Sequence, residues 1–507
     1  MRGLQEKIIQ SQAGAPRLPE TTEGTFPSSR HLKWAITILM VYFGLKLLFF
    51  SITISPYVPP DESTHYAKSM IFSETFFMPE NSDETYEYGL VTNIPWLYYW
   101  IMGKILTLNI FGMPDILFLR LMNIPLAFAS VYFVWRLLRL LTDDRLSQLL
   151  LIVAMTNTLM FTFLSAFVTY DNLANLLAAM AIYYLFAFLK SRSGDLLVIS
   201  LLCQMVGSLT KVTLLPLFLA LNVLLVIHEF KNIRQLPGAL STYFKPAAWR
   251  RFGLALGIFI ALALNIQLYG VNYYHYGSLS PEMHDVLSHD KAMQDRLTAR
   301  NLIFSDFKEG RISKEEALAM ASQIKHPGDR FDTIYLIDNY SNLKKNNLAL
   351  SGPLKYTAFW IQHMSAGIFG IFGHFQMFNT GPTIWPIAAL GILTGIAIVI
   401  RWRPSDADWI PTSLMTIVAF YALFLLCFVS YPAYLDTGEI SLLVQGRYLF
   451  PVLGALYAVS SYYLPRLFLS GRPRLILSVG ACIIFIVSDF PYFLAHVDAD
   501  WFVPLFD

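Results

Sequence analysis

The chain is poor in charged residues. Asp, Glu, Lys and Arg make up 14% of its 507 residues, whereas a typical soluble domain carries about 25%. Hydrophobic residues make up 55%, and the mean hydropathy is +0.49. This composition excludes an ordinary soluble protein and predicts an all-α protein that crosses a membrane many times.

Other features are missing as well. The three cysteines, Cys203, Cys427 and Cys482, all lie inside apolar runs, so their spacing predicts neither a metal site nor a disulfide framework. The sequence has no dense run of Lys and Arg, and no nucleic-acid partner is expected. No short apolar core with a small-residue cleavage site precedes the first apolar segment, which predicts that residues 1–33 are a flexible cytoplasmic tail.

Long apolar segments recur along the chain. A membrane-spanning helix needs about 20 mostly apolar residues. The predicted domains are a core at 34–271 with a first outer loop at 57–115, a large outer loop at 272–381, and C-terminal helices at 382–507. The sequence predicts about eleven spans, at 34–56, 116–138, 149–167, 173–190, 196–212, 213–229, 252–271, 382–401, 411–430, 448–464 and 475–495.

Basic residues gather in alternate connections. Five successive short loops carry them, whereas the opposite short connections hold little more than Lys211 and Arg447. Cytoplasmic loops are the ones enriched in Lys and Arg, so both large loops are predicted to face outward from the cell (inner or plasma) membrane, with the N-terminus inside. The basic loop residues are Arg136, Arg139, Arg145, Lys190, Arg192, Lys231, Arg234, Lys245, Arg250, Arg251, Arg401, Arg403, Arg466, Arg472 and Arg474.

The first outer loop opens with a polar run. Pro59 and Pro60 end the first span, and Asp61, Glu62 and His65 follow. Ionisable groups at the edge of the hydrocarbon are costly and indicate a functional site. The alternative is a solvated helix terminator.

Two aromatic segments lie beside the predicted outer face. Residues 93–112 are amphipathic and predict a helix in the membrane interface, where Trp and Tyr concentrate. A full span is the alternative, but it would move all the later basic loops outside. Residues 359–374 predict a second interfacial or re-entrant segment, and residues 314–318 predict a short surface helix in the large loop.

Four groups of polar residues fall at the outer ends of predicted helices, at one level of the membrane. Asp171 and Asn172 could simply cap a helix, and Lys211 and Arg447 could extend to lipid headgroups. Their shared level favours a common site instead. The groups are Asp61, Glu62 and His65; Tyr170, Asp171 and Asn172; Thr210 and Lys211; and Gln445, Arg447 and Tyr448, preceded by Asp436 and Glu439.

This arrangement suits chemistry on a lipid-linked phosphate, which lies at the headgroup level. Arg binds phosphate oxygens as a fork and Lys as a point charge. A nearby carboxylate can act as a general base on an incoming hydroxyl, and cations stabilise the charge on the departing phosphate. The residues therefore favour transfer of a group from a lipid phosphate to a hydroxyl or amine.

The ordered motifs resemble the GT-C superfamily of membrane glycosyltransferases, which use sugars carried on polyprenyl phosphate. More closely, the chain is similar to a group of bacterial membrane proteins placed near that superfamily, over about residues 50–465. The motifs are Pro59-Pro60-Asp61-Glu62 with His65, Pro95-Trp96-Leu97-Tyr98-Tyr99, Tyr170-Asp171-Asn172-Leu173, Thr210-Lys211, Phe359-Trp360, and Gln445-Gly446-Arg447-Tyr448-Leu449-Phe450-Pro451.

The resemblance implies an inverting hexosyl- or pentosyltransferase with interfacial helices in its first outer loop. The donor would be a polyprenyl-phosphate-linked sugar, and the acceptor a cell-envelope glycan, lipid or protein. Asp61 would be the catalytic base, with Glu62 as second choice and His65 beside them. The donor phosphate would bind Lys211, Arg447 and Tyr448, and the sugar or acceptor would bind Tyr170, Asp171, Asn172 and Gln445.

The sequence also departs from the superfamily. The two acids of the first outer loop are adjacent, whereas the superfamily motif is Asp-x-Asp. The Trp-Trp-Asp-Tyr-Gly motif of oligosaccharyltransferases is absent from the sequence, which argues against transfer of a whole oligosaccharide to a protein asparagine. No spacing requires a cofactor, although Asp61, Glu62 and Asp171 could hold a divalent metal.

Two other functions are compatible with the sequence. A flippase or transporter for a lipid-linked glycan would place polar residues at mid-membrane, whereas here the span centres are apolar apart from Asn157, Gln204 and Asn265. A non-catalytic assembly subunit would tolerate Asp61→Asn and Arg447→Ala, which a glycosyltransferase would not.

Overall fold

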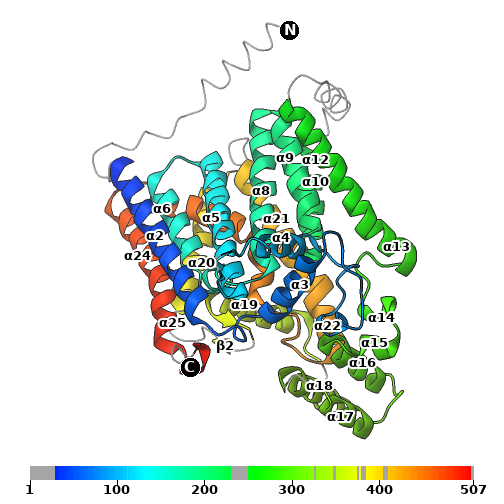
Figure 1. The fold of residues 1–507 in the computed structure, drawn as a ribbon. Helices are drawn as coiled ribbons and strands as arrows, with labels where there is room; N and C mark the ends of the chain where they lie inside the picture. Colours follow the sequence, from blue (N-terminus) through cyan, green and yellow to red (C-terminus); the bar gives the residue numbers. More distant parts are fainter. Residues whose placement is uncertain are drawn as a thin grey trace.

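The computed structural model describes residues 29–110, 112–229, 249–324, 327–345, 350–373, 376–377, 384–403 and 409–503. Its long helices lie side by side, and the short helices of the two large loops gather at one end of them (Figure 1). Most of the predicted tail at 1–33 lies outside the described residues, as do the predicted loop cations Lys231, Arg234 and Lys245.

In the described ranges, eight helical segments are long and apolar enough to cross a membrane. The fold is thus the predicted all-α membrane fold. The eight segments are α2 (Ser29–Thr53), α5 (Asp115–Leu141), α8 (Tyr170–Ser191), η2 (Val212–Leu214) with α10 (Leu215–Glu229), α12 (Trp249–Asn265) with η4 (Ile266–Gly270) and α13 (Val271–Tyr276), α20 (Ile384–Arg401), α21 (Trp409–Phe424) with η6 (Leu425–Ser430) and α22 (Tyr431–Thr437), and α24 (Gly471–Val487) with α25 (Phe490–His496).

The predicted count of eleven full spans is not confirmed, because three of the predicted spans are short. These are α6 (Arg145–Thr156), α9 (Gly194–Ser208) and α23 (Phe450–Tyr463). The predicted span at 149–167 is broken after α6, and α7 (Leu159–Leu164) continues it. At the break, the Asn157 side chain donates to the Val153 carbonyl at 2.9 Å and thereby ends α6.

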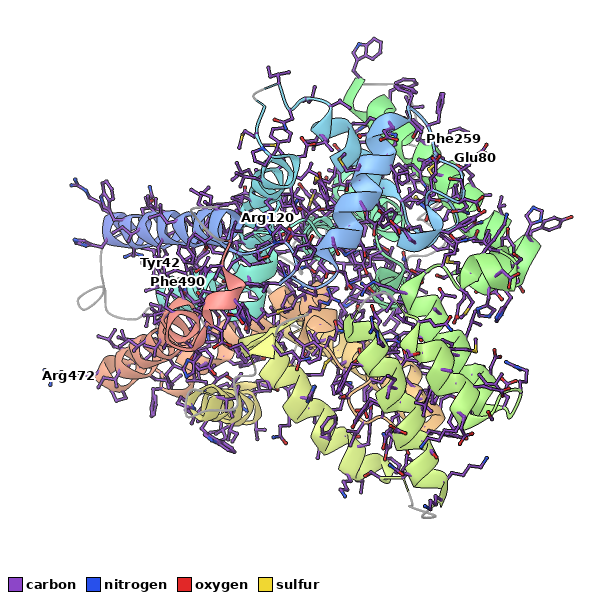
Figure 2. The ribbon with its side chains drawn as sticks, turned by 60° about the horizontal axis from the view of Figure 1, so that its bottom comes forward. Tyr42, Glu80, Arg120, Phe259, Arg472 and Phe490 are labelled. Atoms are coloured by element: carbon purple, nitrogen blue, oxygen red, sulfur yellow. The ribbon has the colours of Figure 1, made fainter. Side chains whose placement is uncertain are left out.

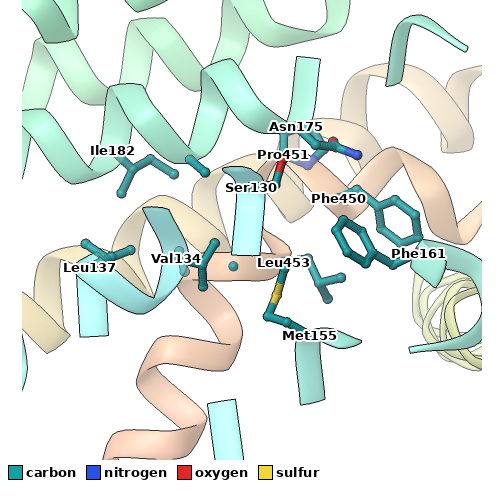
Figure 3. Close-up of a pocket in the computed structure, with 13 residues that line it drawn as sticks. Ser130, Val134, Leu137, Met155, Phe161, Asn175, Ile182, Phe450, Pro451 and Leu453 are labelled. Carbon is teal, nitrogen blue, oxygen red and sulfur yellow. The ribbon is translucent and has the colours of Figure 1, made fainter. Parts of the chain in front are cut away.

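Helix α8 lies at the centre of the bundle. Its span is 83% buried, against 17–39% for the other seven. The alanines Ala174, Ala178 and Ala181 are fully buried, and small residues let neighbouring helices approach closely. The packing of α5, α6, α8 and α23 leaves only about 10 Å³ of free volume beside Ser130 and Asn175 (Figure 3), which is room for about one water.

The first outer loop folds into α3 (Glu62–Glu74), η1 (Tyr86–Tyr88) and α4 (Leu97–Leu106). Helix α4 has 10 residues, which is about 15 Å, or half of the hydrocarbon thickness. Residues 93–112 therefore do not form a full span, as predicted. At Gly103, a Cβ atom would lie 2.7 Å from the Ser69 carbonyl oxygen, so glycine allows α3 and α4 to pack in close contact.

The large outer loop contains a helical unit with its own apolar core. Ile303, Ala317 and Ile337 are almost fully buried in this core. The predicted surface helix at 314–318 is part of α17, which begins with a capping box formed by Ser313 and Glu316. The helices that form this core, called the outer unit, are α16 (Arg296–Lys308), α17 (Lys314–Ser322) and α18 (Pro327–Lys345), whereas α14 (Met283–Val286) and α15 (His289–Ala292) pack with Tyr86 and Leu90 of the first outer loop.

The second predicted interfacial segment forms the latter part of α19 (Pro353–Phe369) and β1 (Ile371–Phe372). Strand β1 pairs antiparallel with β2 (Gln376–Met377), with Ile371 opposite Met377. The remaining short elements are η7 (Gly446–Leu449), η8 (Leu464–Leu467) and η9 (Ala499–Trp501). After η9 the chain returns to α2, where the Ser55 N–H donates to the Trp501 carbonyl at 2.8 Å.

An ion pair lies inside the helical bundle, so the expectation that the span centres are apolar apart from three amide residues is wrong. Lys46 of α2 and Asp489, between α24 and α25, have side chains that are 1% and 0% exposed. Lys46 Nζ also donates to the Thr156 carbonyl at 2.6 Å and to Asn157 Oδ1 at 3.0 Å. The helices that carry this pair lie next to each other in Figure 2, which labels Tyr42 and Phe490 there. The pair therefore joins α2 and α24 to the break between α6 and α7.

Replacing Lys46 by Met should lower the thermal stability of the protein in detergent. The change leaves the Asp489 carboxylate buried without its cation, and breaking a buried pair from one side costs roughly 3–5 kcal/mol. Lys46→Met combined with Asp489→Leu should regain most of the lost stability. A double variant that unfolds at the same temperature as Lys46→Met would contradict this assignment.

Candidate active site

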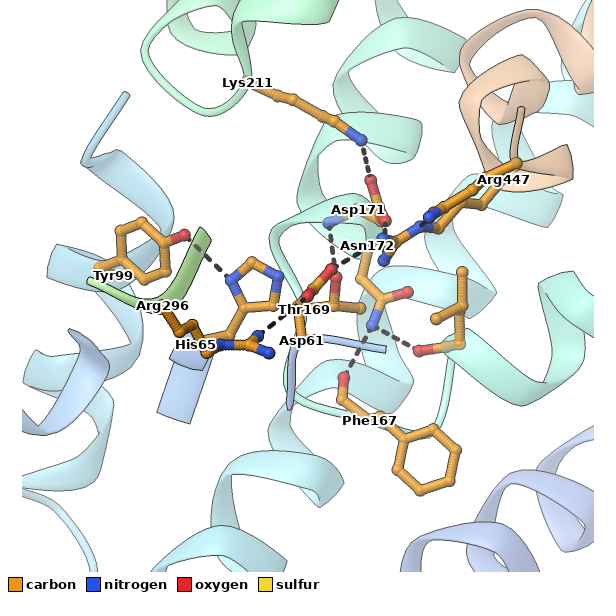
Figure 4. Close-up of polar contacts among 12 residues, drawn as sticks. Asp61, His65, Tyr99, Phe167, Thr169, Asp171, Asn172, Lys211, Arg296 and Arg447 are labelled. Atoms are coloured by element: carbon orange, nitrogen blue, oxygen red, sulfur yellow. Dashed lines mark hydrogen bonds and ion pairs between the residues drawn. The ribbon is translucent and has the colours of Figure 1, made fainter. Parts of the chain in front are cut away.

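Asp61 lies where the first outer loop meets the C-terminal helices and the outer unit (Figure 4). Its Oδ2 accepts a hydrogen bond from Arg447 Nη2 at 2.7 Å, and its Oδ1 lies 3.6 Å from Arg296 Nη2. The backbone φ of Asp61 is 59°, in the left-handed region that is uncommon outside glycine. Such strain concentrates at functional sites, and here it accompanies a carboxylate held between two guanidinium groups.

Arg447 is positioned by close backbone packing. At Gly446, a Cβ atom would lie 2.4 Å from the Gly367 carbonyl carbon of α19, so only glycine fits where η7 crosses α19. Arg447 Nε donates to Gln445 Oε1 at 2.7 Å, which orients the guanidinium. Gln445 thus contacts Arg447, and the predicted role of Gln445 in sugar binding stays a prediction.

Asp171 and Lys211 form the second charged pair of the site. Lys211 Nζ donates to Asp171 Oδ1, and Asp171 Oδ2 lies 3.8 Å from Arg447 Nη1. Lys211 also lies over the rings of Tyr170 and Tyr448, at 4.8 and 5.7 Å from their centroids. Both predicted phosphate-binding cations therefore meet at Asp171, between two aromatic rings.

His65 faces the same group of side chains from α3. Its Nδ1 lies 3.0 Å from the Tyr99 hydroxyl of α4, and the edge of its ring packs on Tyr170 with the centroids 4.4 Å apart. His65 is 4% exposed, and its Nε2 has no hydrogen-bond partner among the described residues. A buried polar atom without a partner is costly, so Nε2 is available to a bound molecule.

Glu62, the second candidate for the base, has a different role. It is 1% exposed, its two oxygens accept from Arg120 Nε and Nη2 at 2.9 and 2.5 Å, and its Oε1 also accepts from the Val168 N–H at 2.9 Å. These contacts leave it no free face toward the site. Glu62 is the first residue of α3 and points to Arg120, whereas Asp61 precedes the helix and points to Arg447.

Asn172 is likewise committed to the fold. Its Nδ2 donates to the carbonyls of Leu164 and Phe167, both at 3.1 Å, and to Asn123 Oδ1 at 3.2 Å. The side chain is buried and holds the turn that precedes α8. The predicted contact of Asn172 with sugar or acceptor stays a prediction.

The surrounding charges set the protonation states of the outer site. Burial raises the pKa of the Asp61 carboxyl, but Arg447 and also Arg296 lower it more, so the pKa lies well below its usual range. Burial lowers the pKa of His65 to about 4, against the opposing effect of Asp61. Near neutral pH, Asp61 is thus ionised and His65 is neutral.

Two cations of the site are not found by the sequence analysis. Arg296 begins α16 and donates to Asp329 Oδ2 at 2.7 Å while it contacts Asp61. Lys68 of α3 lies 5.6 Å from the Tyr99 ring centroid, and burial lowers the pKa of Lys68 to about 8, against the effects of Asp295 and Asp61. Arg296 is one charge among many in a polar loop, and nothing in the sequence distinguishes it.

Arg120 is also missed, although a signal for it exists. It lies inside the apolar segment 116–138, where a charged residue is costly and has a specific partner. A charged residue in an apolar segment predicts an acidic partner, and in the structure this partner is Glu62.

The described residues contain no group of three or more His, Cys, Asp or Glu side chains that could hold a metal ion. Asp61 and Asp171 both lie against Arg447, Asp171 also pairs with Lys211, and Glu62 pairs with Arg120. The donor set for a divalent metal therefore does not fit here, because each of these acids already has a cation beside it.

The chain is similar to known proteins in two ways. Residues 93–244 match the model of the family described as dolichyl-phosphate-mannose-protein mannosyltransferase. No curated protein sequence matches the chain. ArnT from Cupriavidus metallidurans in the apo state is 14% identical with a TM-score of 0.35, covering 86% of this chain and 79% of that one.

A second solved structure is the archaeal oligosaccharyltransferase AglB from Archaeoglobus fulgidus, in complex with an inhibitory peptide and a dolichol-phosphate. It is 11% identical with a TM-score of 0.46, and the match covers 91% of this chain and 56% of AglB. The matched family segment, 93–244, contains α4, Asp171 and Lys211. It confirms over this segment the resemblance to GT-C membrane glycosyltransferases. The apolar helical segments of the described residues are those of a multi-pass membrane protein.

The two adjacent acids should respond differently to loss of charge. Glu62→Gln leaves Arg120 buried with a weakened partner, which costs roughly 3–5 kcal/mol, and should clearly lower the unfolding temperature in detergent. Asp61 is 34% exposed, so Asp61→Asn should change this temperature much less. Equal losses in the two variants would contradict the division of roles.

Proposed function

We propose that the chain moves a sugar from a polyprenyl-phosphate carrier to a cell-envelope glycan, lipid or protein at the extracytoplasmic face of the membrane. The observation that carries the proposal is the placement of Asp61. One ionised carboxylate lies against Arg447, and Arg447 also reaches the Asp171–Lys211 pair. A base next to two cations is what transfer from a phosphate requires.

The reaction is a single displacement at the anomeric carbon. The acceptor oxygen attacks this carbon while its bond to the phosphate oxygen breaks, and the phosphate leaves with the bonding electrons. Asp61 takes the proton of the acceptor hydroxyl. Because one base is enough and no covalent intermediate forms, the configuration at the anomeric carbon inverts.

The same contacts couple donor binding to the strength of the base. In the structure Arg447 donates to Asp61 at 2.7 Å. A phosphate that takes over part of this guanidinium weakens the contact, and the pKa of the Asp61 carboxyl then rises. A stronger base is thus formed only when the donor is in place.

The lipid part of the donor has a suitable cavity nearby. An apolar cavity of about 570 Å³ lies among α19, α20, α21 and α23. Leu449 lines it and follows Tyr448 of the site directly in the chain. A phosphate at Arg447 would therefore have space for its lipid chain within the membrane helices.

The orientation of the protein in the membrane is inferred from the end of the helical bundle at which the basic loop residues lie. Among the described loop residues, Arg474 pairs with Asp144 at 2.7 Å, and Arg401 donates to the Arg466 carbonyl at 2.8 Å. Asp144 follows the end of α5, whereas Arg120, near its start, holds Glu62. The basic loops thus lie opposite the site, which supports an extracytoplasmic site.

Asp61→Asn should abolish sugar transfer without loss of folded protein, because the amide cannot accept the acceptor's proton. The measurement is release of radiolabelled sugar from a panel of polyprenyl-phosphate sugars by membranes of a host lacking the gene. Asp290→Asn is the matched control, since Asp290 is an exposed acid of α15. Wild-type turnover retained in Asp61→Asn would remove Asp61 from this role, and no turnover by the wild type with any donor would count against the function.

Arg296→Gln should shift the pH dependence of transfer. Arg296 helps to lower the pKa of Asp61, so its removal raises that pKa. Asp61 must be ionised to act as a base, and the acidic limb of kcat/KM should therefore move to higher pH. Arg300 lies on the same helix and its Nε donates to the neighbouring Asn301 Oδ1 at 3.2 Å, so Arg300→Gln should leave the profile in place. An unchanged limb in Arg296→Gln would show that this contact does not tune the base.

A further inference from the structure

A polar pocket lies at the C-terminal end of α5, away from the Asp61 site. Tyr132, Trp135, Arg136, Arg139 and Leu140 line it from α5, and Tyr183 lines it from α8, around a volume of about 440 Å³. The five α5 positions follow a helical spacing of three and four residues, so they share one face of the helix. This hollow is called the Arg136 pocket below.

The cations of the Arg136 pocket are held in fixed positions. Arg136 donates from Nη1 to the Tyr132 hydroxyl at 2.8 Å and from Nη2 to the Tyr183 hydroxyl at 2.5 Å. The Arg139 guanidinium lies 5.2 Å from the Trp135 ring centroid. Aromatic contacts of this kind order an arginine without neutralising its charge.

Positive charge is in excess around the pocket. Among the described residues, Arg139 pairs with the acid Asp143 at 3.3 Å, and the two side chains are 47% and 85% exposed, so the pair is weak. The partners of Arg136 are neutral hydroxyls. Lys190 adds a third cation, since its Nζ donates to the Leu140 carbonyl at 2.9 Å. The pocket thus favours an anion.

The position of the pocket identifies the kind of anion. Arg120 lies at the level of the Asp61 site, and α5 runs on through Arg136 to Arg139. At about 1.5 Å per residue this is roughly 24–29 Å, close to the hydrocarbon thickness of about 30 Å. The pocket therefore lies at the opposite headgroup level, and Met122 and Tyr132 are exposed along the same helix, at 36% and 46%.

We propose that the Arg136 pocket binds the headgroup of an anionic phospholipid, distinct from the donor lipid of the transfer site. A phosphodiester oxygen accepts hydrogen bonds from Arg136 and Arg139, as guanidinium groups bind phosphate well. Trp135 and the tyrosines lie at the headgroup level, where such rings concentrate. The acyl chains follow the exposed side of α5. Basic pockets between membrane helices are a recognised place for anionic lipids.

The test is lipid binding by the purified full chain, measured by native mass spectrometry. Phosphatidylglycerol and phosphatidylcholine with the same acyl chains are titrated separately. The wild type is expected to bind phosphatidylglycerol at least tenfold more tightly, and Arg136→Gln with Arg139→Gln should lose this preference. Arg472→Gln is the matched control, because Arg472 is an exposed cation two residues from Arg474, which pairs with Asp144 at the same end of the bundle.

The single Arg139→Gln variant keeps the test informative if the double variant does not fold. Arg139 is half exposed, so its loss leaves the fold intact and should weaken phosphatidylglycerol binding severalfold. Equal binding of the two lipids by the wild type, or an undiminished preference in Arg139→Gln and in a folded double variant, would overturn the proposal. Displacement of phosphatidylglycerol by millimolar inorganic phosphate would assign the pocket to a free anion instead. None of these outcomes depends on sugar transfer.

Discussion

The buried pair of Arg120 and Glu62 is the interaction on which the outer end of the protein depends. Arg120 also donates to the carbonyls of Ser51 and Ile54 at 2.9 and 2.8 Å, and Glu62 accepts from the Val168 N–H. One pair therefore fixes the end of α2, the start of α3 and the turn before α8. Asp61 and Asp171 lie directly beside these points. A buried pair gives weak net stability, but it specifies a geometry.

Much of the fold could be predicted because apolar length and charge are local signals. The long spans, the short helix α4 and the helix at 314–318 follow from these local signals. The interfacial placement of α4 stays a prediction. The break at Asn157 could not be predicted, because an asparagine in an apolar run does not show that its side chain will donate to the Val153 carbonyl and accept from Lys46, which is far away in the sequence. The short lengths of α6, α9 and α23 were missed for a similar reason: helix ends are set by side-chain contacts that apolarity does not register.

The candidate site was predicted in part. Asp61, His65, Asp171, Lys211 and Arg447 come together as their shared membrane level indicates. The sequence could not separate Asp61 from Glu62, since which neighbour faces the site depends on where Arg120 lies. The amide of Asn172 holds the turn before α8, a contact that the sequence does not distinguish from sugar binding, and its role at the sugar or acceptor stays a prediction. Arg296 needed the fold of the outer unit to reach the site.

The left-handed backbone at Asp61 has a consequence for selection experiments. Glycine adopts a φ of 59° without the penalty of roughly 1–2 kcal/mol that a side chain incurs there. This gain offsets part of the cost of taking the carboxylate from Arg447, so a library screened only for thermal tolerance can accept glycine at this position and lose the carboxylate. Folding and turnover therefore place different demands on Asp61. A stabilised but inactive variant should be sequenced at this position before its inactivity is attributed to any other change.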